Sequence, residues 1–246
     1  MINNQLLNPQ SIVIIGGSDD IQKPGGKIIY NILKGDFKNA LYVVNPKNDE
    51  IQGLKSYNNV SDIPETELAI LAIPAKFCPQ TVKVLAEEKN TKAFIILSAG
   101  FSETNEEGAE FEKQIVDTVN KHNAVLIGPN GIGMLTPHYN GVFTSPIPKL
   151  TPQGVDFISG SGATAAFIME LGIPNGLTFA NVFSVGNSAQ IGVEEVLEYM
   201  DKTFDENSPK VKLLYLEKIN KQYSELISSE NNLLLNKFLD KHNIYN

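Results

Sequence analysis

The sequence predicts an α/β protein built on a parallel sheet, and three features of its first half support that fold class. Short apolar runs rich in β-branched residues alternate with amphipathic stretches. The runs are continuously apolar instead of alternating apolar and polar residues, as expected when helices cover both faces of a parallel sheet. Each run ends in Gly, Pro or Asn, residues that mark turns. We therefore expect five strands joined by helical crossovers.

The expected elements of this first unit follow in chain order. The strands are SIVIIGG (11–17), ALYVVNP (40–46), LAILAIP (68–74), KAFIILSAG (92–100) and AVLIGPN (124–130). The crossovers are KIIYNILKG (27–35), CPQTVKVLAEEKN (78–90) and EEGAEFEKQIVDTVNKHN (106–123).

The stretch 143–153 marks a boundary, because it carries three prolines within seven residues. Proline disfavours helix and interior strand, so we expect an extended linker there. Residues 1–142 then form the first domain, and residues 154–246 form a second, smaller α/β domain with a polar helical tail. Three strands make a small sheet, so we expect this second domain to be incomplete. Its expected elements are strands VDFISG (155–160), LTFANVFSVG (177–186) and KVKLLYLE (210–217), with helices SGATAAFIMELG (161–172) and GVEEVLEYMDKTF (192–204).

The composition argues against several classes of partner. Among 246 residues, 20 Lys and Arg stand against 28 Asp and Glu, for a net charge of −8. The negative electrostatic field of such a protein repels nucleic acid and anionic membranes, so we expect neither as a partner. There is no basic, apolar leader and no run of about 18 apolar residues that would span a membrane, so we expect a cytoplasmic protein. With one cysteine and three scattered histidines, we expect no bound metal.

The loops that follow the predicted strands are the candidate binding site. In an open parallel sheet, ligands bind at the carboxyl ends of the strands, near the point where strand order reverses. The loop 16–26 is rich in glycine at both ends and opens a helix, which suits a phosphate group. A turn that only needs positive φ is the alternative. The candidate loops are GGSDDIQKPGG (16–26), NPK (45–47), IPAK (73–76), SAGFS (98–102) and GPNGIG (128–133).

The end of the second strand narrows the choice of ligand. Domains that bind NAD place an Asp or Glu there to hold a ribose hydroxyl. Here the strand ends in Asn45, Pro46 and Lys47, with no acid at that point. Lys47 would put positive charge where a phosphate on the adenosine could lie. This disfavours NAD and permits coenzyme A (CoA) or NADP, with a solvated loop lysine as the alternative.

The order of these motifs resembles the NDP-forming acyl-CoA synthetases, relatives of the succinyl-CoA ligase α subunit. The resemblance covers residues 1 to about 220 and includes IVIIGGSDDIQKPGGKIIYNIL, FIILSAGFSE, LIGPNGIGML, DFISGSGATAAFIME and VFSVGNSAQIGVEEVLEYM. It implies a Rossmann-type CoA-binding domain followed by a flavodoxin-like, succinyl-CoA synthetase-like domain, with coenzyme A as the ligand. The implied CoA contacts are Gly16, Gly17, Ser18, Lys23, Gly25, Gly26, Lys47, Ile73, Pro74, Ala75, Ser98, Ala99, Gly100, Phe101 and Asn130.

The same resemblance implies an acid–thiol ligase reaction. In the family, acid, CoA and NTP interconvert with acyl-CoA, NDP and phosphate. The phosphoryl group is carried by a histidine of the second domain, which becomes phosphorylated. Glu217 resembles the carboxylate that orients this histidine. The loop SGSGA resembles the one that holds the phosphoryl group, with a plain helix cap by Ser161 as the alternative. The implied phosphate-loop residues are Ser159, Gly160, Ser161, Gly162 and Ala163.

The Ser-His-Thr-Gly segment that bears the family's histidine does not occur in the sequence. His122 and His138 fall in a helix end and a turn, and His242 lacks glycine neighbours, so none is expected to replace it. The chain is therefore predicted to hold CoA without completing the reaction alone. It would serve as the CoA-binding portion of a synthetase or, alternatively, as a non-catalytic CoA or acyl-CoA sensor. An NADP-binding oxidoreductase domain is the third interpretation.

A nucleotide-grasp subunit, or the rest of a longer synthetase, would supply the missing parts. The incomplete second sheet and an apolar stripe in the tail predict a partner or a homo-oligomer, with packing of the tail on its own chain as the alternative. Cys78 is expected to be a small buried residue, and a mixed disulfide with the CoA thiol is the alternative. The stripe consists of Leu226, Leu233, Leu234, Phe238 and Leu239.

Overall fold

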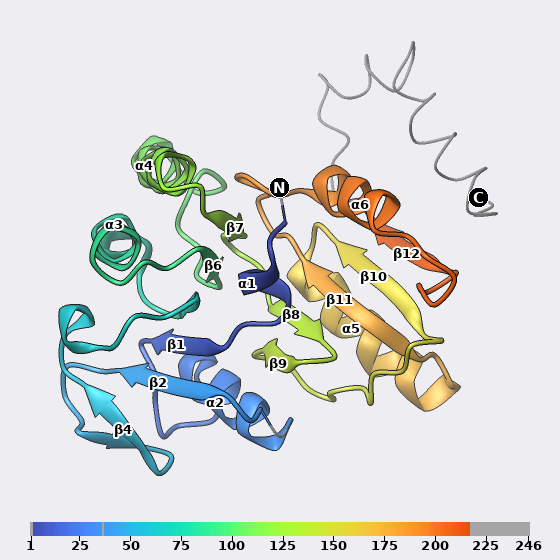
Figure 1. Cartoon of the computed structure of the whole chain (residues 1–246), viewed down its shortest axis with the longest axis horizontal. Helices are drawn as coiled ribbons and strands as arrows, with labels where there is room; N and C mark the ends of the chain where they lie inside the picture. The colour runs from blue at the N-terminus through green and yellow to red at the C-terminus, as the bar shows by residue number, and fades with distance from the viewer. Residues whose placement is uncertain (1, 36, 217–246) are drawn as a thin grey trace.

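The computed structural model describes residues 2–35 and 37–216, which form two β-sheets (Figure 1). The first sheet has the strand order β3-β4-β2-β1-β5-β6-β7, and every adjacent pair is parallel except β3 with β4. The five strands predicted for the first unit are confirmed, and the short β3–β4 hairpin adds to them. The strands are β1 (Ser11–Ile15), β2 (Ala40–Val44), β3 (Glu50–Ile51), β4 (Leu54–Tyr57), β5 (Leu68–Leu71), β6 (Ala93–Ile96) and β7 (Val125–Ile127).

Strand β1 shows why these segments are continuously apolar. Ile12 and Ile14 pack into one apolar cluster, while Val13 and Ile15 pack into another. Because successive side chains of a strand point to opposite faces, the two clusters lie on the two sides of the sheet. The central strand is therefore buried on both faces, as predicted.

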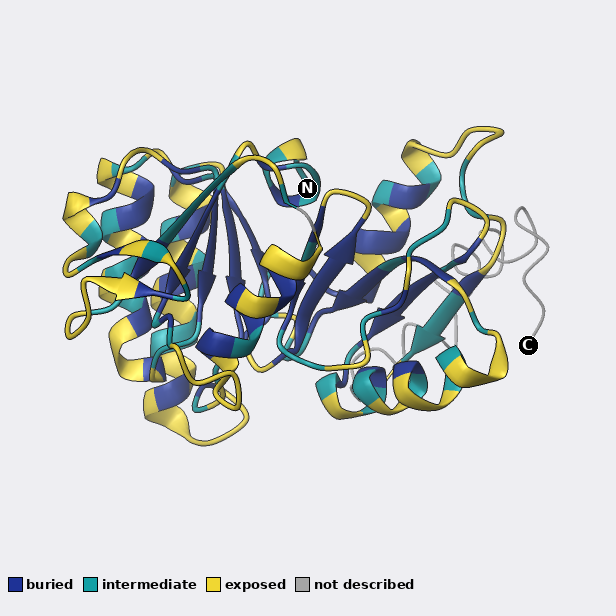
Figure 2. Cartoon of the chain, turned by 90° about the horizontal axis from the view of Figure 1, so that it is seen from below, coloured by how far each residue is buried: buried dark blue, intermediate teal, exposed yellow. Residues whose placement is uncertain are grey.

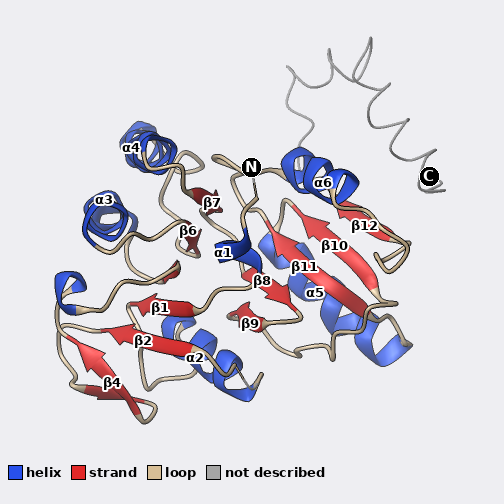
Figure 3. Cartoon of the chain, in the orientation of Figure 1, coloured by secondary structure: helices blue, strands red, loops and turns tan. Residues whose placement is uncertain are grey.

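Helices cover both faces of the first sheet (Figure 3). The apolar side of α2 packs into the cluster that holds Ile12, whereas α3 and α4 pack into the cluster that holds Val13. Strand order reverses between β1 and β5, so the loops that follow these strands form the expected ligand edge. The helices are α1 (Asn4–Leu7), α2 (Pro24–Lys34), α3 (Cys78–Glu88) and α4 (Glu106–Lys121), with 3-10 turns η1 (Val60–Asp62) and η2 (Ala75–Phe77).

The second sheet has the order β12-β10-β11-β8-β9. The three predicted strands β10, β11 and β12 are parallel, and the antiparallel hairpin β8–β9 pairs with β11. The expectation of a three-stranded sheet is therefore wrong, because a hairpin from before the proline-rich stretch joins it. The elements are β8 (Gly133–Thr136), β9 (Tyr139–Val142), β10 (Val155–Ser159), α5 (Gly162–Gly172), η3 (Ile173–Asn175), β11 (Phe179–Ser184), α6 (Val193–Lys202) and β12 (Lys212–Tyr215).

The same hairpin ties the two sheets together. Asn31 of α2 donates from Nδ2 to the carbonyl of Val142 (2.7 Å), and the Tyr139 hydroxyl donates to the carbonyl of Leu6 (2.8 Å). Met134 of the hairpin packs in the same cluster as β1 and α2, so one apolar core runs between the units. Figure 2 shows the strands of both sheets largely buried beneath partly exposed helices. None of the helices within the described ranges is long and apolar enough to cross a membrane.

Candidate functional site

The loop 16–26 joins β1 to α2 and folds back tightly on itself. Gly16 has a φ of +84°, and its N–H donates to the carbonyl of Val44 (3.0 Å). A Cβ on Gly25 would lie 2.0 Å from the Gly16 carbonyl oxygen, and one on Gly26 would lie 2.1 Å from that of Asp20. Only glycine fits so close to another backbone segment. The loop therefore forms a compact backbone cradle at the start of a helix, which suits a phosphate group.

Helix α2 begins without a side-chain cap. Its N-cap is Lys23 and its first residue is Pro24, which has no N–H to satisfy. Lys23 is exposed, with its Nζ 3.9 Å from the Asp20 carboxylate. Ser18 is engaged within the loop, since its Oγ accepts the N–H of Asp20 (3.1 Å). The helix dipole and the lysine both favour an anion at this end of α2.

Gln52 holds the glycine-rich loop from outside, and the sequence analysis missed it. Its Nε2 donates to the carbonyls of Ser18 (2.8 Å) and Gly26 (2.9 Å), and its N–H donates to the Asp19 carboxylate (2.7 Å). Gln52 lies in the β3–β4 turn with a φ of +50°. The signal available in the sequence was the Gln-Gly pair, which marks a tight turn shortly after the predicted second strand.

Asn45 ties the end of β2 to the same loop. Its Nδ2 donates to the carbonyl of Gly17 (2.8 Å), and its Oδ1 accepts the N–H of Lys47 (2.8 Å). Lys47 is exposed, and its ammonium group forms no ion pair with any residue that the structure describes. The structure thus brings Lys47 to the edge that carries the glycine-rich loop, with its charge available to a ligand.

The loops after β5, β6 and β7 are bonded to one another along the same edge. The Ser98 hydroxyl donates to the carbonyl of Ile73 (2.5 Å), and the N–H of Asn130 donates to the carbonyl of Ser98 (3.0 Å). Three loops far apart in the sequence therefore meet, as the parallel sheet predicts. Of the remaining predicted contacts here, the structure exposes Pro74 and Ala99 and buries Ala75 and Phe101.

The backbone N–H groups of Gly100 and Phe101 are occupied by Glu103, a residue that the sequence analysis did not single out. Its Oε1 accepts from Gly100 (2.6 Å), and each of its oxygens lies 3.2 Å from the Phe101 nitrogen. Burial would raise the pKa of Glu103, but hydrogen bonds from Asn187 and from these backbone groups lower it below the ordinary value. The carboxylate is therefore ionised at neutral pH.

The loop 159–163 opens helix α5 and is bonded within itself. Ser161 is the N-cap, and its Oγ accepts the N–H of Thr164 (3.3 Å). The buried Ser159 hydroxyl donates to the carbonyl of Ser161 (2.7 Å), and the Gly160 N–H donates to Tyr215 (2.9 Å). The helix cap by Ser161, which was the alternative to a phosphoryl-binding loop, is thus present. No acidic residue lies in the first turn of α5, so this helix N-terminus still favours negative charge.

The candidate catalytic residues are only partly accounted for. Glu217 and His242 lie outside the described residues. His122 is the C-cap of α4, half-buried, with its Nε2 3.8 Å from the Glu87 carboxylate. His138 lies in the β8–β9 turn and is exposed. Neither of these two histidines belongs to the loops that carry the predicted CoA and phosphate contacts.

Cys78 is fully buried at the start of α3, as expected for a small core residue. Burial raises the pKa of its thiol to about 12, so the thiolate that a mixed disulfide with CoA would require is disfavoured. Over residues 2–35 and 37–216, no group of three or more His, Cys, Asp or Glu side chains could hold a metal ion.

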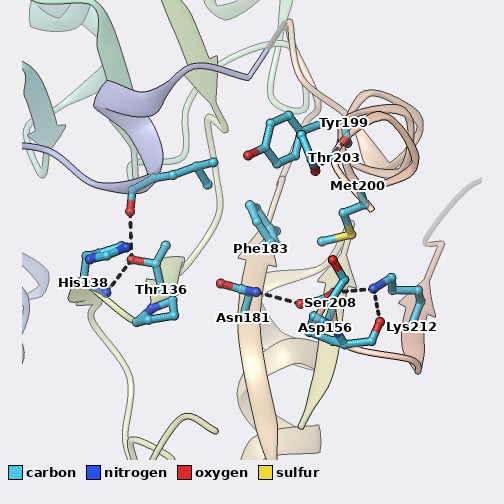
Figure 4. Close-up of a pocket in the computed structure, with 13 residues that line it drawn as sticks. Thr136, His138, Asp156, Asn181, Phe183, Tyr199, Met200, Thr203, Ser208 and Lys212 are labelled. Atoms are coloured by element: carbon cyan, nitrogen blue, oxygen red, sulfur yellow. Dashed lines mark hydrogen bonds and ion pairs between the residues drawn. The ribbon is translucent and has the colours of Figure 1, made fainter. Parts of the chain in front are cut away.

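A cavity of about 230 Å³ lies at the other end of the second sheet (Figure 4). Lys212, at the start of β12, pairs with Asp156, near the start of β10 (2.5 Å), and both side chains are 3% exposed. Asn181 donates from Nδ2 to the second oxygen of Asp156 (2.7 Å). His138 also lines this cavity. The buried charges satisfy one another, so we interpret this cavity as a structural feature, away from the loop that follows β10.

Comparison with known proteins agrees with the geometry of the ligand edge. The family model described as a CoA binding domain matches residues 10–137, about half of the chain. The model described as a succinyl-CoA ligase like flavodoxin domain matches residues 152–229. The fold and these matches define a protein of the CoA-binding class.

More particularly, the chain belongs to the family of NDP-forming acyl-CoA synthetases. It is 38% identical to acetate–CoA ligase (ADP-forming) II subunit alpha of Pyrococcus furiosus, over 86% of this chain and 45% of the relative. It is 32% identical to 4-hydroxybutyrate–CoA ligase (ADP-forming) of Nitrosopumilus maritimus, over 88% of this chain and 31% of the relative. The chain spans less than half the length of these relatives.

A solved structure supports the same assignment. The apo form of a dinucleotide forming acetyl-coenzyme A synthetase 1 from Ca. Korarchaeum cryptofilum is 29% identical and superimposes with a TM-score of 0.80. The match covers 91% of this chain and 48% of that one. The similarity therefore extends over both sheets described above.

Proposed function

We propose that the chain binds coenzyme A at the carboxyl edge of the first sheet and serves as the CoA-binding portion of an NDP-forming acyl-CoA synthetase. The observation that carries this proposal is the glycine-rich loop 16–26, whose backbone leaves no room for a Cβ at Gly25 or Gly26. Such a cradle at the start of α2 suits the pyrophosphate of CoA. The reaction of the complete assembly would convert acid, CoA and NTP into acyl-CoA, NDP and phosphate.

Lys47 supports CoA over NAD as the ligand. Its charge lies beyond the end of β2, where an NAD-binding domain would place a carboxylate to hold the ribose. An exposed lysine that forms no ion pair with the residues described by the structure suits the 3′-phosphate of CoA. NADP, with a phosphate on the neighbouring ribose carbon, is the competing ligand to be tested.

The second unit supports a role in phosphoryl chemistry. The N-terminus of α5, with no acidic residue in its first turn, would stabilise a phosphoryl group through its dipole and backbone N–H groups. Ser159 and Ser161 shape that turn through their hydrogen bonds. Glu217 would orient the group that carries the phosphate. A nucleotide-grasp partner would supply the nucleotide, and the cytoplasm is the expected compartment.

Calorimetric titration of the full chain with CoA, dephospho-CoA and NADPH tests the ligand assignment. We expect CoA to bind more tightly than dephospho-CoA, because only CoA carries the 3′-phosphate, and both to bind more tightly than NADPH. Absence of CoA binding at millimolar concentration would overturn the proposal. Tighter binding of NADPH than of CoA would instead favour an oxidoreductase domain.

A non-catalytic CoA or acyl-CoA sensor is the second candidate function. The placement of His122 and His138 outside the predicted site loops favours it, since neither is positioned to carry a phosphoryl group there. Incubation with labelled NTP and a nucleotide-grasp subunit separates the two functions. We expect no acid-labile phosphate on this chain; a phosphorylated His242 would instead show that the chain supplies the catalytic histidine itself.

A further inference from the structure

Asn187, in the loop after β11 of the second unit, reaches the ligand edge of the first unit. Its Nδ2 lies 2.6 Å from an oxygen of Glu103 and 3.0 Å from an oxygen of Glu112. Its Oδ1 accepts from the side-chain amide of Asn130 (3.3 Å), and its backbone N–H donates to the carbonyl of Pro129 (2.9 Å). One side chain therefore contacts the loops after both β6 and β7.

Glu103, which accepts a hydrogen bond from Asn187, also binds the backbone of the loop after β6. It binds the N–H groups of Gly100 and Phe101, and Gly100 has a φ of +104°, which L side chains rarely adopt. The Phe101 ring is fully buried and anchors the other side of the turn. The carboxylate and the ring together fix the conformation of this loop.

The same bonds continue into the loops that carry the predicted CoA contacts. Asn130, which contacts Asn187 through its side chain, donates from its backbone to Ser98, and Ser98 donates to Ile73. A continuous series of hydrogen bonds thus runs from the second unit to the loop after β5. A shift at Asn187 would move three of the loops that line the ligand edge.

The neutral amide of Asn187 suits this position for an electrostatic reason. It satisfies two carboxylates, Glu103 and Glu112, at an edge where a ligand with several phosphates is expected. A lysine or arginine would pair more strongly with the two acids. It would also attract the ligand phosphates to the wrong place, whereas the amide adds no charge.

We propose that Asn187 and Glu103 form a latch between the two units that positions the loop 98–103 for CoA. The inference rests on the proposed CoA binding at this edge. Both are positioning residues: Asn187 holds Glu103, and Glu103 holds the backbone of the loop. Through the latch, occupancy of the CoA site is coupled to the loop after β11 in the second unit.

The test compares CoA affinity in five full-length proteins: wild type, Asn187→Ala, Glu103→Gln, the double variant of these two, and the control Glu112→Gln. Glu112 contacts the same amide (3.0 Å) and accepts the Ser102 hydroxyl (2.9 Å), but it binds no backbone N–H of the loop. A glutamine at 112 can keep both contacts, with its oxygen accepting from Asn187 and its amide donating to the Ser102 hydroxyl oxygen, so this variant should keep wild-type affinity. We expect Asn187→Ala and Glu103→Gln each to raise the dissociation constant about tenfold, since each removes a hydrogen bond to a charged group. The double variant should be weakened little further, because the two residues act through one contact.

Amide hydrogen exchange at Gly100 and Phe101 supplies a second readout. We expect faster exchange in Asn187→Ala and Glu103→Gln than in Glu112→Gln, and an Asn187→Gln variant should partly restore the slow exchange. Wild type that fails to bind CoA would overturn the proposed function. Wild type that binds CoA, with unchanged affinity in Asn187→Ala, would overturn the latch alone. If Asn187→Ala does not fold, the comparison of Glu103→Gln with Glu112→Gln decides the matter.

The pH dependence follows from the lowered pKa of Glu103. The contact is fully formed above the ordinary range of a glutamate and is lost as the pH falls through the lowered value. Between about pH 6 and 8, the Glu103→Gln variant should therefore bind CoA more weakly than wild type by a constant factor. A difference that disappears within that range would contradict the assignment.

Discussion

Two of the turns that lead from a parallel strand into a helix begin their helices in opposite ways. At the first turn, β1 leads into α2 through glycines packed against backbone, and no side chain caps the helix. At the second, β10 leads into α5, and Ser161 caps the helix with its own hydroxyl. The first turn leaves the helix N-terminus to an external anion, whereas the second partly satisfies it within the chain.

We interpret this difference through the two ligands proposed for these turns, CoA at the first and a phosphoryl group at the second. A ligand held through its pyrophosphate needs a cradle that is rigid before the ligand arrives, and the tight glycine packing with Gln52 and Asn45 provides one. A phosphoryl group that arrives and leaves needs a turn that is stable while it is empty. The cap by Ser161 gives the second turn that property.

The largest effect is expected from Gly25→Ala. The new Cβ would lie 2.0 Å from the Gly16 carbonyl oxygen, so the loop must open. We expect the free energy of unfolding to fall by about 3 kcal/mol and CoA binding to be lost. Chemical denaturation and calorimetric titration measure the two effects.

Gly162→Ala is the matched control, because Gly162 is the first residue of α5 and its Cβ would lie 3.0 Å from a methyl group of Ile132. That change should cost less than about 1 kcal/mol, since alanine is the better helix former. Equal costs at the two glycines would show that the first turn is not specially constrained.

A smaller effect is expected from Lys47→Ala. Loss of one exposed charge should weaken CoA binding about fivefold and leave binding of dephospho-CoA unchanged, because only CoA carries the 3′-phosphate. Lys83→Ala, which removes an exposed lysine from α3, serves as the control for net charge. If both lysine variants weaken CoA and dephospho-CoA alike, the effect comes from the overall field and not from a phosphate contact.

The smallest effect on CoA affinity is expected from Ser161→Ala. Loss of the N-cap should lower the free energy of unfolding by about 1 kcal/mol and leave CoA affinity unchanged. Ser161→Asp should restore most of the stability, because aspartate also accepts from the helix backbone. Thermal unfolding with and without CoA measures both quantities. A loss of CoA affinity in Ser161→Ala would mean that the two turns do not act independently.

The strands and helices of both units could be predicted because each apolar segment carries its own periodicity and turn signals. The β3–β4 hairpin was missed, since it is short and the exposed side chains of Glu50 and Lys55 obscure its pattern. The hairpin β8–β9 was missed for a different reason: its strands are buried against elements far away in the sequence. Local pattern cannot show which sheet such a hairpin will join.

The site residues show the same distinction between features that depend on local sequence and features that depend on distant contacts. The sequence by itself determined the glycine-rich turn, the lysine after β2 and the cap at Ser161, because each depends on residue type within a few positions of the chain. Only the tertiary structure decided that Gln52 would brace the first loop and that Asn187 would meet Glu103. These contacts join positions 34 and 84 residues apart. The first exists only after the β3–β4 hairpin has joined the first sheet, and the second only after the two sheets have packed together.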